Sequence, residues 1–445
     1  MSSFITLYIS NEFGTASYGE YSLYAALLSA SLVFGGFGIN AFLQNTLPRA
    51  QRTFFTVLVS TSLIRFFVAL FFSFFFSYFY NINVFLLSLY FTISSLSLMI
   101  YDNVLIYEGR IKLAFYSKFV SNIFKLFAIV FISDGVESYI LQAVLFDFFI
   151  MITSIVIQRS NVRVRFDRVL SINTIARNFM NFKSVYFGNL LSFFQTPAFL
   201  IMYFSSLSVG YEELSSFSFV VNIGFFFFNA ISLLSRTESI FVSKSLLRKA
   251  YFVNFDIVKL SFIILVSANV IIYFYKNEII KFIFNGNYED TYYFINIVGV
   301  IALINSFNYL LSPIIYLNKR FSMFSISSLV TMLGLLILPV GYYIYDDVVF
   351  SFGIYALIIM SVLKVVYMYS SCYKISKDIT LNCMKNVVYI PLIAMVAIFI
   401  SQVFICFVNV NNIYLLFFSS GSIFLVTLLI CSYIFKIKLD NLRNV

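Results

Sequence analysis

Residues 134–168 read DGVESYILQAVLFDFFIMITSIVIQRSNVRVRFDR and contain the pattern that decides the fold. The stretch begins with the acidic residues Asp134 and Glu137, continues with an apolar run of about 20 residues at 138–157, and ends in a joint with four arginines. A run of that length crosses roughly 30 Å of bilayer hydrocarbon as an α-helix. Because basic loops are retained in the cytoplasm, the helix is predicted to run from the outer to the inner side of a membrane.

The same alternation continues along the chain. Short joints separate apolar segments of roughly 20 residues. Basic joints alternate with joints that are acidic or neutral. The basic joints hold 24 of the 29 lysine and arginine residues, whereas the other joints hold two and the apolar segments three. The basic joints contain Arg49, Arg52, Arg110, Lys112, Lys118, Arg159, Arg163, Arg165, Arg168, Arg177, Lys183, Arg236, Lys244, Arg248, Lys249, Lys259, Lys319, Arg320, Lys374, Lys377, Lys385, Lys436, Lys438 and Arg443. This bias predicts a multi-pass membrane protein.

The composition excludes several classes of protein. Only 11% of the residues are charged, against about 25% in soluble domains, and 61% are hydrophobic. The net charge of +10 arises in the cytoplasmic joints, so no nucleic-acid partner is expected. The chain has no histidine, which excludes histidine-dependent catalysis and removes the usual metal ligand. Its four cysteines lack CxxC spacing and are interpreted as small apolar residues, so neither a disulfide framework nor a metal site is expected.

Thirteen apolar stretches are long enough to span the bilayer. Their approximate limits are 21–43, 54–79, 84–105, 114–133, 138–157, 184–206, 213–235, 257–275, 291–317, 321–345, 348–371, 387–408 and 412–435. Met1–Ser10 would reach only about 15 Å as a helix, so we expect the outer half of a truncated first helix there. With it, the sequence predicts an all-α polytopic protein of about fourteen transmembrane helices with both termini cytoplasmic. Pro197 and Pro313 interrupt spans and are expected to bend them.

A faint internal repeat relates the two halves of the chain. Residues 18–23, YGEYSL, are echoed about 190 residues later by residues 209–214, VGYEEL, and each motif leads into an apolar helix. We therefore expect two six-helix bundles in a parallel pseudo-twofold arrangement around a central cavity with alternating access. The expected parts are an N-terminal bundle at 1–157, a basic cytoplasmic linker at 158–183, a second bundle at 184–371 and an appended helix pair at 387–435.

Several short motifs resemble the polysaccharide flippases, of the O-antigen or Wzx type, in the multidrug/oligosaccharidyl-lipid/polysaccharide (MOP) exporter superfamily. The motifs are Gly14, residues 18–23, residues 37–41 (FGINA), Pro48-Arg49, Gly210-Tyr211 and residues 284–288 (FNGNY). They are similar to the family's glycine turns before helices 2, 8 and 10, and to the end of helix 2 with its basic loop. The resemblance extends over essentially the whole chain.

The resemblance implies a function. Family members are thought to flip undecaprenyl-diphosphate-linked oligosaccharide repeat units to the outer leaflet of the bacterial cytoplasmic (inner) membrane. It thus implies a transporter rather than an enzyme, whose partners are a polyprenyl-diphosphate-linked oligosaccharide, membrane lipids and polysaccharide polymerase machinery. Residues 194–197, FQTP, stand where many relatives carry an Arg-Asp pair in helix 7, so a role of that pair does not transfer to this chain.

Three basic residues lie inside predicted spans, where a charge costs roughly 2.5–3.5 kcal/mol. They are Arg65, Lys125 and Lys364. A flippase needs a hydrated cationic cavity for a diphosphate, so these residues are candidate substrate ligands. Arg65 leads because a guanidinium matches phosphate in a bidentate fork. The alternatives are an Arg65–carboxylate pair that joins two helices, and lysine side chains that extend to the membrane interface.

Asp147 is the only carboxylate at the centre of a predicted span. It is expected either to carry coupling protons or to form a static ion pair with Lys125 or Arg65. Asp102, near the cytoplasmic end of its helix, is a second candidate for coupling or pairing. Arg236 lies at the inner mouth of the span 213–235, where it either meets an entering diphosphate or marks topology.

Other functions stay open. A drug or ion antiporter of the same superfamily would need a binding lobe richer in carboxylates, and a lipid II flippase would share the fold. An O-antigen polymerase or ligase usually has a long periplasmic loop, whereas the longest outer joint here is about 276–290. Coupling to H⁺ or Na⁺ would add driving force, and the sequence does not choose between these ions.

Overall fold

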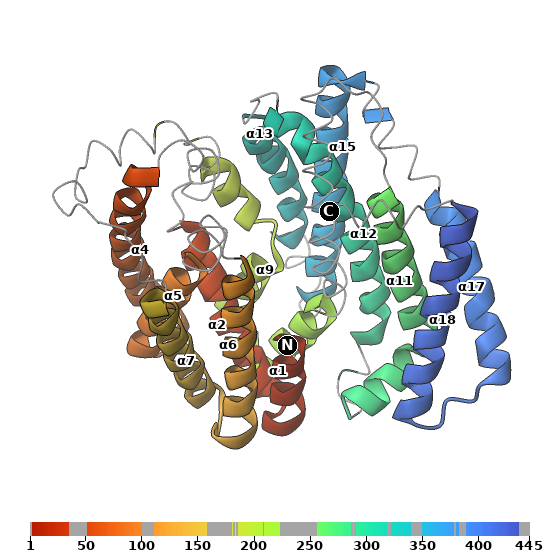
Figure 1. Ribbon diagram of the computed structural model, residues 1–445, viewed down its shortest axis with the longest axis horizontal. Helices are drawn as coiled ribbons and strands as arrows, with labels where there is room; N and C mark the ends of the chain where they lie inside the picture. Colours follow the sequence, from red (N-terminus) through yellow and green to blue (C-terminus); the bar gives the residue numbers. More distant parts are fainter. Residues whose placement is uncertain are drawn as a thin grey trace. The chain divides into compact units, whose positions relative to one another are not determined.

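The computed structural model is helical, with no β-strand among the residues that it describes (Figure 1). These are residues 2–34, 51–99, 111–157, 186–207, 209–222, 256–285, 291–317, 322–339, 349–377 and 389–435, with a few isolated positions between them. The helices are α1 (Ser2–Tyr8), η1 (Ile9–Phe13), α2 (Thr15–Phe34), α4 (Gln51–Tyr80), α5 (Val84–Met99), α6 (Ile111–Phe131), α7 (Val136–Ile157), α9 (Pro197–Ser206), α11 (Asp256–Ile283), α12 (Tyr292–Leu317), α13 (Ser322–Thr331), η5 (Met332–Leu336), α15 (Val349–Ile375), α17 (Tyr389–Phe407) and α18 (Ile413–Ile434). The predicted all-α fold is confirmed.

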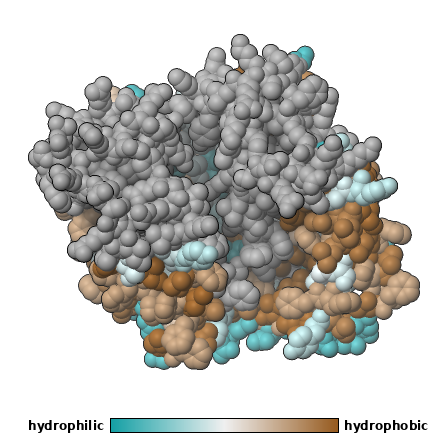
Figure 2. Space-filling view, in the orientation of Figure 1, coloured by the Kyte–Doolittle hydropathy of each residue, from teal (hydrophilic) through white to brown (hydrophobic). Residues whose placement is uncertain are grey.

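Apolar side chains cover the outside of the described helices. Large aromatic residues such as Phe71 in α4 and Phe418 in α18 are about two-thirds exposed, at 66% and 65%. Figure 2 shows hydrophobic surface over the described helices on one face, with hydrophilic residues gathered at the lower edge. Helices satisfy their own backbone hydrogen bonds, so such a surface is stable against lipid. Among the described residues, five helices can cross a membrane by length and composition.

A bent helix pair raises that number to six. Residues 186–193 and α9 meet at an angle of 54°. The break follows from Pro197, which stands at the first position of α9 and has no N–H to donate. Thr196 caps the new helix by accepting a hydrogen bond from the Phe199 N–H. The total of about fourteen spans stays a prediction.

The helices form two compact units, residues 1–215 and 216–445. In the first unit, α2 packs against α4, α5, α7 and α9, and α6 packs against α7. The 186–206 pair is held in this unit by two tyrosine hydroxyls. Tyr186 donates to the Phe34 main-chain oxygen at 3.0 Å, and Tyr80 donates to the Met202 oxygen at 3.1 Å. The division into bundles at 1–157 and 184–371 stays a prediction.

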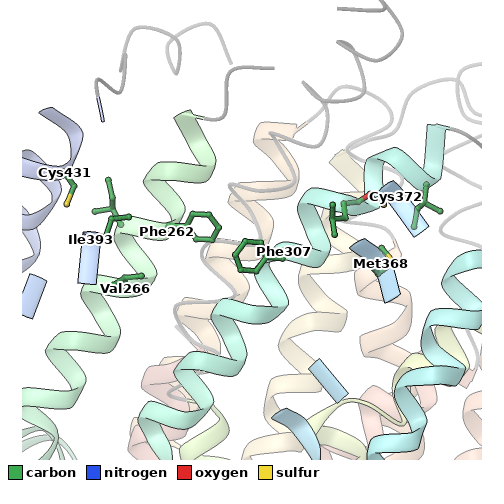
Figure 3. Packing of buried hydrophobic residues seen from close by; sticks show 10 residues of the cluster. Phe262, Val266, Phe307, Met368, Cys372, Ile393 and Cys431 are labelled. Carbon is green, nitrogen blue, oxygen red and sulfur yellow. Dashed lines mark hydrogen bonds between the residues drawn. The ribbon is translucent and has the colours of Figure 1, made fainter. Parts of the chain in front are cut away.

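In the second unit, α11 packs against α12 on one side and against α17 and α18 on another. Their shared core contains Phe262 and Val266 of α11, Phe307 of α12, and the buried thiols Cys372 and Cys431 (Figure 3). The Phe262 and Phe307 rings lie 5.1 Å apart between centroids. Cys372, Cys406 and Cys431 are free thiols, whereas Cys383 lies outside the described residues.

The first described segment is helical from Ser2 to Phe13, as α1 and then the π-turn η1. Gly14 ends it with φ of 91°, a left-handed conformation that favours glycine, and α2 begins at the next residue. Met1–Ser10 is therefore helical over its described part, and its assignment as half of a longer helix stays a prediction.

Candidate functional site

An ion pair inside the first unit joins two of the predicted site residues. Lys125 Nζ of α6 donates to Asp147 Oδ2 of α7 at 2.6 Å. Ser121 Oγ donates to the other carboxylate oxygen, Oδ1, at 2.5 Å. Both oxygens of Asp147 are thus engaged, one by a charge and one by a hydroxyl. Such charge-assisted hydrogen bonds are among the strongest that proteins form.

The local sequence explains this geometry. Ser121 and Lys125 are four residues apart in α6, so their side chains lie on one face of the helix. The turn between α6 and α7 is short, and the two helices pack directly against each other. Asp147 lies in the middle of α7, far from both ends of that helix. The two donors therefore meet the carboxylate in the middle of a helix that is long and apolar enough to cross a membrane.

The pair is shielded from its surroundings. The side chains of Lys125 and Asp147 are 22% and 11% exposed. Two tyrosines, Tyr90 of α5 and Tyr139 of α7, lie within electrostatic range of Asp147. Removing one partner of a shielded pair leaves an uncompensated charge, which is costly. The site consequently holds one positive and one negative group in mutual balance.

The other predicted residues are placed as follows. Lys364 lies on α15, is half-buried, and forms no ion pair or hydrogen bond with any described residue. Arg65 lies within α4, a continuous helix from Gln51 to Tyr80, but its side chain lies outside the described part. Asp102 and Arg236 also lie outside the described residues. Among the predicted site residues that the structure describes, only Lys125 and Asp147 are in contact with each other.

A second polar cluster was missed by the sequence reasoning. The Tyr24 hydroxyl donates to Glu137 Oε1 at 2.9 Å, linking α2 to the first turn of α7. Glu20, one turn before Tyr24, interacts electrostatically with Glu137 and with Tyr211. These residues belong to three helices that are distant in sequence, and no spacing in the chain indicates that they meet.

Solved structures of two transporters have a fold similar to that of this chain. No protein-family model and no curated protein matches the chain. A solved lipid II flippase, MurJ in an inward closed conformation, matches with a TM-score of 0.66 and 15% identity over 99% of this chain and 96% of that one. An inward-facing multidrug resistance MATE family transporter of the MOP superfamily matches with a TM-score of 0.61 and 12% identity, over 84% of this chain and 93% of that one. At these identities the matches show the fold alone: the chain has a helical fold similar to those of these two transporters.

Proposed function

We propose that this chain is a flippase that carries polyprenyl-diphosphate-linked oligosaccharide repeat units across the cytoplasmic membrane of a bacterium. The observation that carries the proposal is the Lys125–Asp147 ion pair within a chain of MOP transporter fold. A charge pair at membrane depth is expensive and typically serves transport or proton relay. The basic residues inside the spans suit an anionic headgroup, and the sequence motifs resemble polysaccharide flippases.

The ion pair has a defined role in this proposal. A diphosphate needs cationic hydrogen-bond donors while it crosses hydrocarbon, and Lys125 is such a donor. In the described state its charge is balanced by Asp147, which acts as a resident counter-ion. An arriving diphosphate replaces the carboxylate as the partner of the ammonium group, and a proton neutralises the displaced carboxylate. Exchange of counter-ions keeps the lysine paired throughout the transport cycle.

A lipid II flippase is the second candidate. It is favoured by the match to MurJ, which extends over 99% of this chain, whereas the match to the MATE transporter extends over 84%. Both candidate substrates are lipid-linked, so the ion pair and the fold suit either one. The two candidate substrates differ in their carbohydrate part.

Complementation in two bacterial strains tests the proposal. One strain lacks its polysaccharide flippase, and the other is depleted of its lipid II flippase. We expect the chain to restore surface polysaccharide in the first strain, provided that the host makes the matching repeat unit, and not to restore growth in the second. The opposite result would be restored growth of the second strain, together with no surface polysaccharide in strains that make a range of repeat units. That result would contradict the proposal and assign the chain as a lipid II flippase.

A further inference from the structure

The hydroxyl of Ser121 bonds outside its own helix. A serine hydroxyl inside a helix commonly bonds to the main-chain oxygen four residues earlier. Ser73 of α4 does so, because its Oγ donates to the Ala69 oxygen at 2.6 Å. Ser121 of α6 donates instead to Asp147 Oδ1 of α7 at 2.5 Å. A hydroxyl has a single proton to donate, so Ser121 directs it to the carboxylate of the neighbouring helix.

Asp147 has two hydrogen-bond partners among the described residues, and they differ in exposure. One is the Lys125 ammonium at 2.6 Å, and the other is the Ser121 hydroxyl. The Lys125 side chain is 22% exposed, whereas Ser121 is 3% exposed. The lysine is therefore the more accessible partner of the carboxylate, and the serine is buried beside it.

The two partners of Asp147 also differ in their chemistry. An ammonium group has three N–H donors and no acceptor, so Lys125 holds Asp147 only as the ionised carboxylate. A hydroxyl donates its proton to a carboxylate, and through a lone pair it accepts the proton of a carboxylic acid. In the proposed transport cycle, Asp147 changes between these two forms as the diphosphate takes its place beside Lys125. Ser121 satisfies both forms from one position.

Loss of the Ser121 hydroxyl affects the two states of the pair unequally. In the resting pair, the ammonium has further N–H donors, and one of them can turn to Asp147 Oδ1 when the hydroxyl is absent. After the exchange, Lys125 is bonded to the diphosphate, and Ser121 is the remaining partner of Asp147 among the described residues. A buried polar group without a partner is unfavourable. The serine therefore stabilises the substrate-bound state more than the resting state.

We propose that Ser121 is a positioning residue for the exchange of partners at Lys125. It keeps Asp147 hydrogen-bonded while the lysine is bonded to the diphosphate, and it holds the carboxyl group where the ammonium returns after the substrate leaves. Ser121 acts through Asp147 and does not touch the substrate. The inference rests on the proposed function and adds to it a residue that sets how readily the lipid-linked diphosphate displaces the resident carboxylate.

Saturation of lipid transfer in liposomes tests this role. The purified full-length chain is reconstituted with increasing mole fractions of a fluorescent polyprenyl-diphosphate-linked oligosaccharide, and initial rates give the half-saturating fraction and the maximal rate. Ser121→Ala should raise the half-saturating fraction about tenfold with little change in the maximal rate, because it weakens the bound state. Ser121→Cys keeps a weak donor of similar size and should show a smaller rise. Ser73→Ala, which removes a fully buried hydroxyl that bonds to its own helix, is the matched control and should saturate like the wild type.

Each other outcome contradicts the role of Ser121. Wild-type saturation of Ser121→Ala would overturn it while leaving the proposed function in place, as would a fall in the maximal rate alone, which indicates a structural role. An equal rise in Ser73→Ala would assign the effect to the loss of any buried hydroxyl. Should Ser121→Ala fail to fold, wild-type saturation of Ser121→Cys would decide against the serine. A wild-type chain that transfers lipid no faster than protein-free liposomes would contradict the proposed function and this inference with it.

Discussion

The main-chain carbonyl of Tyr211 occupies the space that a side chain at Gly19 would need. A Cβ atom built on Gly19 would lie 1.8 Å from the Tyr211 oxygen, far inside any real contact distance. Gly19 and Tyr211 belong to the two related motifs YGEYSL and VGYEEL, which lie about 190 residues apart. The first turns of α2 and of the helix that begins at Tyr211 therefore lie in direct contact, and the absence of a side chain at Gly19 permits it.

Gly19→Ala is expected to destabilise the chain. The added methyl group meets main-chain atoms, which cannot rotate away as a side chain can, and overpacking of this kind costs about 1–3 kcal/mol. Gly210→Ala is the matched control, because a Cβ atom at Gly210 meets nothing within 4 Å. Thermal unfolding should show a lower midpoint for Gly19→Ala and little change for Gly210→Ala. Equal effects of the two substitutions would contradict the close approach.

Single and double variants separate a transport role of the Lys125–Asp147 pair from a static one. Lys125→Met or Asp147→Leu alone leaves one uncompensated charge and should cost about 3–5 kcal/mol of stability. The double variant removes both charges and should recover most of that stability. If the pair serves transport, the double variant folds well and still fails to export polysaccharide, as measured by surface polymer at matched protein levels in the membrane. Normal export by a stable double variant would show that the pair only joins α6 to α7.

The hydroxyl of Tyr24 is expected to stabilise the first unit through Glu137. Tyr24 is 1% exposed, and a hydrogen bond to a charged group contributes about 1.5–3 kcal/mol. Tyr24→Phe should lower the unfolding midpoint accordingly. Tyr78→Phe, at a tyrosine that is 86% exposed, should have no measurable effect. If both variants unfold at the wild-type temperature, the hydrogen bond from Tyr24 to Glu137 does not stabilise the contact between α2 and α7.

Labelling of single introduced cysteines tests the orientation in the membrane. Glu213 lies in an acidic joint and Arg165 in a basic one, so a membrane-impermeant thiol reagent should reach position 213 in intact cells and position 165 only after permeabilisation. A background without the four native cysteines supplies the control. Labelling of position 165 alone in intact cells would reverse the orientation.

The sequence alone predicts the positions of the helices well. The apolar runs 138–157, 387–408 and 412–435 correspond to α7, α17 and α18, whose observed limits differ from them by only a few residues. These limits are readable because a span must be apolar throughout and must end where polar residues begin. The predicted span 321–345 differs, because in its described part α13 ends at Thr331 and continues as the tighter turn η5.

The contacts between helices are harder to predict. The partner of Asp147 was left open between Lys125 and Arg65, and Lys125 lies on the adjacent helix of a short hairpin, where contact is favoured by proximity in the chain. Tyr24 and Glu137 are 113 residues apart, and their contact depends on how α2 and α7 rotate and pack. Rotation and depth of a helix are set by packing, which a hydropathy pattern does not contain.

Direct measurement of lipid transfer tests the central claim. The purified chain is reconstituted in liposomes with a fluorescent polyprenyl-diphosphate-linked oligosaccharide, and a membrane-impermeant quencher reports how much label lies in the outer leaflet over time. We predict that the wild-type chain moves the labelled lipid between leaflets, and that the stable Lys125→Met/Asp147→Leu variant moves it at the rate of protein-free liposomes. A wild-type rate equal to that of protein-free liposomes, in preparations where the chain is folded and correctly inserted, would contradict the assignment as a flippase of this lipid class.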